Sequence, residues 1–134
     1  MLSYRPMSHR VTALGAVVVV IVGLSACGGK SDDQKVRAVV NGFDKALLDN
    51  KFAQACDDLS ATLVTEAFGT RSRCIASIAT NNPSTEAGTI KSATVKGDSA
   101  TVVAQGTTEG PSAIELRKEN GTWKITGPLK LFKG

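Results

Sequence analysis

The chain has 134 residues, with 16 lysines and arginines against 12 aspartates and glutamates, and a formal net charge of +4. A chain of this length holds one small domain and leaves no room for a second once a leader is removed. The basic residues form no stripe interleaved with aromatic side chains, which argues against nucleic acid as a partner.

The first segment has the pattern of a secretory signal peptide. Residues 1–10 carry Arg5, His9 and Arg10 but no acid, and residues 11–23 are almost wholly apolar. A charged start, a short apolar core and small residues before a cleavage site define such a leader. The apolar run reaches Ala26 at most, about 16 residues, whereas a spanning helix needs roughly 20. A permanent transmembrane helix is therefore the weaker interpretation.

The residues after this apolar run, Leu24-Ser25-Ala26-Cys27, resemble the bacterial lipobox. In lipoproteins with this motif, the cysteine thiol receives a diacylglyceryl group and the chain is cut just before it. The resemblance implies that residues 1–26 are removed, that Cys27 becomes the lipidated N-terminus and that residues 27–31 form a short tether. Two acyl chains suffice for stable anchoring, so we expect the protein on the extracytoplasmic face of the cell membrane. The alternative is an ordinary signal peptide followed by an unmodified cysteine.

Two further cysteines belong to the exported part of the chain. Removing residues 1–26 leaves 108 of the 134 residues and 14 basic residues against 12 acidic ones, because Arg5 and Arg10 are lost. In an oxidising compartment Cys56 and Cys74 are expected to form a disulfide. The alternative is two free buried thiols. The exported chain contains no histidine, so we expect no metal site.

Residues 32–49 are predicted to form an amphipathic helix. The sequence Ser31-Asp32-Asp33-Gln34 has the pattern of a capping box, with Ser31 as the N-cap and Gln34 at the third helical position. Apolar side chains at helical spacing define one face of this helix: Val36, Val39, Val40, Phe43 and Leu47.

Shorter helices are expected next, before the chain changes to strands. One is predicted at residues 52–59 and carries Cys56, and two lie within residues 61–80, separated by Gly69-Thr70. Cys74 falls on the second of these two, so the disulfide would hold this region against the 52–59 helix. The turn-forming residues 81–84 end the helical half.

The second half of the domain is predicted to be an antiparallel meander, with strands at residues 89–96, 99–107, 112–118 and 122–126. Asn120-Gly121 between two alternating segments is a strong hairpin signal. Alternation places Ile114, Leu116, Trp123 and Ile125 on one side and Glu115, Arg117 and Lys124 toward water. The apolar residues within 129–132 are expected to cover the sheet edge or to pack on a helix. Helices followed by a meander indicate one α+β domain over residues 32–134, with the helices on one face of the sheet.

Several segments together resemble a known family. They are residues 39–43, 48–52, 55–60, 97–102 and 116–125, and the last contains the Asn-Gly hairpin followed by Trp123-Lys124-Ile125. The pattern is similar to the small actinobacterial lipoproteins with a nuclear-transport-factor-2-like domain, over most of residues 32–134. The resemblance implies a cone in which a curved sheet wraps helices and leaves a pocket at its open end. The superfamily includes ketosteroid-isomerase-like enzymes, polyketide cyclases, ligand binders and interaction modules, so the fold does not assign the function.

The residue inventory argues against catalysis. The enzymes of this superfamily place Asp, His, Tyr or Arg inside the cone, whereas here His9 and Tyr4 lie in the leader. Asp57-Asp58 is the one candidate carboxylate pair, but neighbouring helical residues point about 100° apart and do not converge, so capping and solvation explain them better. No nucleophile elbow, phosphate loop or dinucleotide fingerprint is present. We therefore predict no catalytic residues and no cofactor, with a ketosteroid-isomerase-like enzyme as the alternative.

A non-catalytic binding role fits the sequence better. Nine apolar side chains are candidates to line a cavity for a small apolar ligand, although they would equally make an ordinary filled core: Phe43, Leu47, Leu63, Phe68, Val102, Ile114, Leu116, Trp123 and Ile125. The basic cluster Arg71-Ser72-Arg73 would meet a lipid phosphate or a carboxylate, or would simply be exposed. A third possibility is an interaction subunit that docks a partner protein of the cell envelope.

Overall fold

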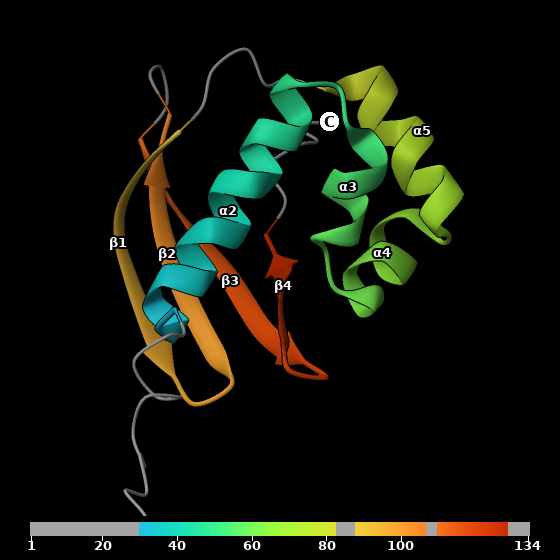
Figure 1. Cartoon of the computed structure of the whole chain (residues 1–134). Helices are drawn as coiled ribbons and strands as arrows, with labels where there is room; N and C mark the ends of the chain where they lie inside the picture. Colours follow the sequence, from blue (N-terminus) through green and yellow to red (C-terminus); the bar gives the residue numbers. More distant parts are fainter. Residues whose placement is uncertain (1–29, 83–87, 107–109, 129–134) are drawn as a thin grey trace, which may run out of the picture.

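The computed structural model describes residues 30–82, 88–106 and 110–128 (Figure 1). Helices precede strands, so the predicted α+β class is confirmed. The elements are α2 Asp32–Leu48, α3 Phe52–Asp57, α4 Ala61–Phe68, α5 Arg71–Asn81, β1 Thr89–Lys96, β2 Ser99–Gln105, β3 Pro111–Glu119 and β4 Thr122–Gly127. The leader, Cys27 and residues 129–132 lie outside the described residues. Among the helices that are described, none has the length and apolar character needed to cross a membrane.

The start and the buried face of α2 agree with the sequence pattern. Ser31 Oγ accepts a hydrogen bond from the Gln34 backbone N–H, and the Gln34 side chain accepts one from the Ser31 N–H, which completes the capping box. The predicted apolar face is buried except at Val39, which is partly buried. The cap therefore fixes where α2 begins, and the apolar stripe fixes which side of it meets the rest of the domain.

The three short helices are separated where the sequence predicts breaks. Ser60 and Thr70 cap α4 and α5 by accepting hydrogen bonds from the backbone N–H groups of Leu63 and Arg73, at 3.1 and 3.2 Å. Gly69 follows α4 with a φ of 83°, a conformation that favours glycine and ends the helix. The predicted Cys56–Cys74 disulfide is present and joins α3 to α5, with both cysteines buried.

The strands form an antiparallel meander in the order β1-β2-β3-β4. An inward-facing row crosses all four strands, through Val95, Ala100, Leu116 and Ile125. The neighbouring positions of β3, Glu115 and Arg117, are exposed, so the predicted alternation is confirmed there. Gly106, predicted near the end of the second strand, is not part of β2, which ends at Gln105, and Thr107 lies outside the described residues. Glycine weakens a strand interior because it has no side chain to pack.

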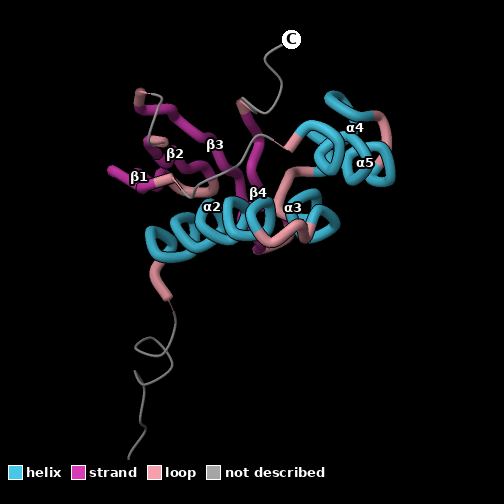
Figure 2. The backbone as a smooth tube through the Cα atoms, turned by 90° about the horizontal axis from the view of Figure 1, so that it is seen from above, coloured by secondary structure: helices cyan, strands magenta, loops and turns pink. Residues whose placement is uncertain are grey.

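The helices are placed differently from the single covering layer that the sequence suggested. α2 lies across one face of the sheet and contacts β1, β2 and β4 (Figure 1). Figure 2 shows α4 and α5 gathered to one side, beyond β4. α3 packs on α2 and α5, and α4 packs on α5 and β4. The disulfide and the short loops hold these three small helices to each other, so only α2 covers the sheet face.

The free edge of β4 is covered by the loop between α3 and α4. Ile125 N–H donates to the Asp58 carbonyl, and Ser60 N–H donates to the Ile125 carbonyl, both at 2.8 Å. Leu59 thereby forms a parallel bridge with Ile125 and is itself buried. Covering an edge strand satisfies backbone groups that would otherwise pair with another chain. Residues 129–132, which were expected to cover the sheet edge or to pack on a helix, lie outside the described residues.

We expect loss of the disulfide to destabilise the domain. Changing Cys56 and Cys74 together to alanine should lower the free energy of unfolding by about 3 kcal/mol, because the bridge closes a loop between cysteines 18 positions apart. Urea denaturation of the variant and the oxidised parent would measure the loss. A gain of two hydrogens in intact mass on reduction of the parent is the control for the bridge, and equal stability of the two proteins would contradict the prediction.

Candidate functional site

Most of the residues predicted to line a cavity lie in the core that α2 and the sheet enclose. Phe43, Leu47, Val102, Leu116, Trp123 and Ile125 are buried, and Leu63, Phe68 and Ile114 are partly buried and packed against them. The core also contains side chains that were not predicted to line a cavity: Val36, Val40, Ala46, Ala55, Cys56, Leu59, Cys74, Ile78 and Ala100. The structure therefore brings the nine predicted residues together in a packed core.

Two open clefts of similar size flank α4 instead. The Thr62 cleft has a volume of about 430 Å³ and is lined by Ser60, Thr62, Leu63, Glu66, Asp98, Arg117, Lys118, Glu119 and Thr126. The Val64 cleft has a volume of about 450 Å³ and is lined by Cys56, Asp57, Leu59, Ala61, Val64, Thr65, Gly69, Thr70, Arg71, Glu119 and Lys124. Glu119 borders both. Of the nine residues predicted to line a cavity, only Leu63 lines either of these two clefts.

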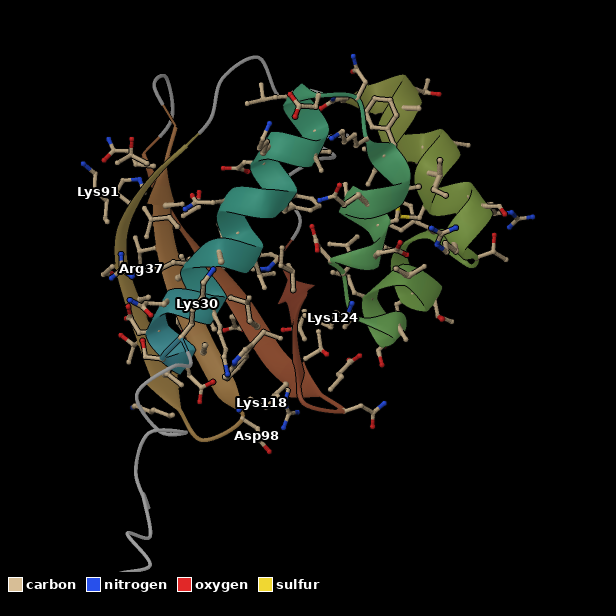
Figure 3. All side chains as sticks on the ribbon, viewed as in Figure 1. Lys30, Arg37, Lys91, Asp98, Lys118 and Lys124 are labelled. Carbon is tan, nitrogen blue, oxygen red and sulfur yellow. A yellow bond between two sulfur atoms is a disulfide. The ribbon has the colours of Figure 1, made fainter. Side chains whose placement is uncertain are left out.

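Charged side chains at the rim of the Val64 cleft are held by one another. Arg71 donates two hydrogen bonds to the Asp57 carboxylate, at 2.8 and 3.0 Å. These bonds lower the pKa of Asp57 and raise the pKa of Arg71. Lys124, which extends from β4 in Figure 3, donates to the Asp57 carbonyl. The basic cluster at residues 71–73 was expected to meet a lipid phosphate or a carboxylate, or to be exposed. At Arg71 the partner is the Asp57 carboxylate of the same chain.

The neighbouring Asp58 behaves differently from Asp57. Its side chain is half-buried, and its Oδ2 atom is buried with no hydrogen-bond partner. Burial raises the pKa of Asp58 to about 6, against an opposing effect of the Lys124 charge. The prediction that solvation and capping account for this side chain was wrong. Its backbone N–H does cap the C-terminal end of α3 by donating to the Gln54 and Ala55 carbonyls, but docking of the loop on β4 leaves one carboxylate oxygen buried.

The half-buried Asp44 on α2 is a second carboxylate with a raised pKa. Burial raises the pKa of Asp44, while a hydrogen bond from the Gly88 backbone N–H at 3.3 Å partly compensates. Asp44 lines neither of the two clefts, and neither does Asp58.

Comparisons with known proteins assign no family. No protein-family model matches the chain, and no curated protein is significantly similar to it. Within residues 30–82, 88–106 and 110–128, no three Asp, Glu, His or Cys side chains gather closely enough to hold a metal ion. The candidate site therefore rests on geometry alone, as the surface of α4 and the two clefts beside it.

We expect the Asp58→Asn variant to be more stable than the parent at pH 7, by about 1 kcal/mol. The pKa of Asp58 rises from 3.8 unfolded to about 6 folded. That difference corresponds to roughly 3 kcal/mol, which solvent screening of a half-exposed group reduces. Because the folded state binds the proton more tightly, the contribution of Asp58 to stability is greatest below pH 4 and is lost as the pH rises through 6.

Urea denaturation between pH 4 and pH 8 would test this, with Asp57→Asn as the matched control. The pKa of Asp57 is lowered in the fold, so its contribution has the opposite sign and is lost as the pH falls. An Asp58→Asn variant with the same pH dependence as the parent would rule out a raised pKa at Asp58.

Proposed function

We propose that this protein is a lipoprotein anchored through Cys27 to the extracytoplasmic face of the cell membrane. Its domain would serve as a non-catalytic binding module for a partner protein of the cell envelope. The observation that carries the proposal is the lipobox-like Leu24-Ser25-Ala26-Cys27 directly after the apolar run. The Cys56–Cys74 disulfide supports it, because disulfides persist in oxidising compartments outside the cytoplasm.

Two structural features favour a partner protein over a small apolar ligand. The apolar residues that would line an internal cavity are packed in the core, and the two clefts beside α4 are open to the surface and bordered by charged residues. α4 itself has no buried residue, although Leu63, Val64 and Phe68 on it are partly buried. A partly apolar helix between two clefts has the character of a protein-binding surface.

The resemblance to nuclear-transport-factor-2-like domains belongs to the same proposal. A long helix lying across one face of an antiparallel sheet supports it. The cone shape, with a pocket at its open end, is the part of that resemblance which would favour a small ligand. The ketosteroid-isomerase-like alternative is favoured by the raised pKa of Asp58 alone, and it is disfavoured because Asp58 lines neither of the two clefts.

Substitution of Cys27 tests the anchor. We expect the Cys27→Ser variant to be unprocessed or released from the membrane, because the serine hydroxyl offers no thiol for the diacylglyceryl group. Membrane fractionation with metabolic labelling by an alkyne fatty acid would measure both effects. The control is Ser25→Ala, which keeps a small residue in the motif and should stay labelled in the membrane fraction. An unlabelled parent chain would refute the proposal.

Native mass spectrometry tests the choice between partner and ligand. A chain beginning at Gly28, produced in an oxidising compartment, is expected at its bare calculated mass, because its core is filled by its own side chains. Repeating the measurement after denaturing extraction is the control for bound molecules. A stoichiometric adduct that extraction releases would show a cavity and replace the partner-protein proposal with carriage or sensing of that ligand.

A further inference from the structure

Three chain segments meet at one end of the domain and are joined there by hydrogen bonds. Asp32, the first residue of α2, accepts a hydrogen bond from Trp123 Nε1 at 3.1 Å and is paired with Lys118 Nζ at 3.4 Å. The Lys118 backbone N–H donates to the Asp98 carbonyl in the β1–β2 turn at 2.8 Å. We call this end, with residues 30–32, the 97–98 turn and the 120–121 turn, the hairpin end (Figure 1).

The opposite end of the domain is held together in the same way. Asn82, directly after α5, donates from its side-chain amide to the Leu47 carbonyl near the end of α2, at 2.8 Å. α2 has 17 residues, so the two ends lie roughly 25 Å apart along its axis. The domain therefore has two distinct poles, and the chain enters it at the hairpin end.

The tether between Cys27 and α2 is too short for the domain to turn its hairpin end away from the membrane. Three residues separate Cys27 from the N-cap Ser31, and a fully extended chain over that span reaches at most about 14 Å. With Cys27 lipidated, Ser31 stays within that distance of the headgroups. An inverted domain would need Ser31 to stand roughly 25 Å above the membrane, which exceeds the reach of the tether.

From this geometry we infer that the hairpin end is the surface that faces the lipid headgroups. The inference rests on the proposed lipidation of Cys27. The exposed side chains at this end are polar or charged and include Lys30, Lys96, Asp98 and Asn120, while Figure 3 shows Lys118 close to Asp98. Such a surface suits contact with hydrated headgroups and not insertion among acyl chains. The end at Asn82 then points away from the membrane, whereas Asp98 and Lys118, which also line the Thr62 cleft, lie on the membrane side.

The tether, and not surface charge, sets this orientation. Lys118 and Lys35 are both paired with the Asp32 carboxylate, and the exposed Asp98 carries a charge opposite to those of the exposed Lys30 and Lys96. Attraction to anionic lipid falls off with ionic strength, whereas the reach of a covalent tether does not. The orientation is therefore expected to be the same at low and high salt.

Fluorescence quenching by labelled lipid would test the inference. The lipidated full chain carrying Asp98→Cys or Thr122→Cys, each labelled with a fluorophore, is reconstituted into phosphatidylcholine–phosphatidylglycerol vesicles that contain headgroup spin-labelled lipid. Lys51→Cys, an exposed position near the opposite pole, is the matched control. We expect at least about twofold stronger quenching at 98 and 122 than at 51, since α2 separates the two poles.

Each outcome has a defined meaning. Stronger quenching at both hairpin positions, unchanged at high salt, supports the inference. Equal quenching at the three positions, or stronger quenching at position 51, overturns it. Sedimentation of the same samples separates this result from a failure of the proposed anchor. If the parent chain does not pellet with the vesicles and its mass shows no lipid, the proposed function has failed at Cys27, and the inference fails with it.

Discussion

Burial of one apolar stripe of α2 is the constraint on which the rest of the domain depends. Val36, Val40, Phe43 and Leu47 are almost fully buried, and α2 contacts three of the four strands as well as α3. A small domain buries little apolar surface in total. Much of its stability therefore comes from the contact between this helix and the sheet. The cap at Ser31 and the hydrogen bonds that Asp32 accepts from Trp123 and Lys118 fix the helix against the β3–β4 hairpin.

The short helices depend on two local connections of a different kind. The disulfide joins α3 to α5, and the Asp58–Ser60 loop pairs its backbone with β4. The second connection has a cost, because it leaves an oxygen of Asp58 buried without a partner. A carboxylate in this situation resists ionisation. The raised pKa of Asp58 is thus a consequence of covering the sheet edge and does not require a catalytic role.

The proposed function follows from what the core leaves exposed. Because the residues predicted to line a cavity are packed in the core, the surface around α4 is the better candidate for binding. The short tether gives that surface a defined relation to the membrane. A domain with one packed core and a short anchor presents a limited set of surfaces to other molecules.

The sequence by itself determined the elements that depend on local interactions. The capping box, the apolar stripe of α2, the break at Gly69-Thr70 and the Asn120-Gly121 hairpin were predicted because each uses residues only a few positions apart. Only the tertiary structure decided that α3–α5 lie beside β4, that Arg71 is bound by Asp57 and that one carboxylate oxygen of Asp58 is buried while Asp57 is exposed. Two adjacent aspartates are equivalent in sequence and differ only when the loop that carries them docks on a strand more than 60 residues away.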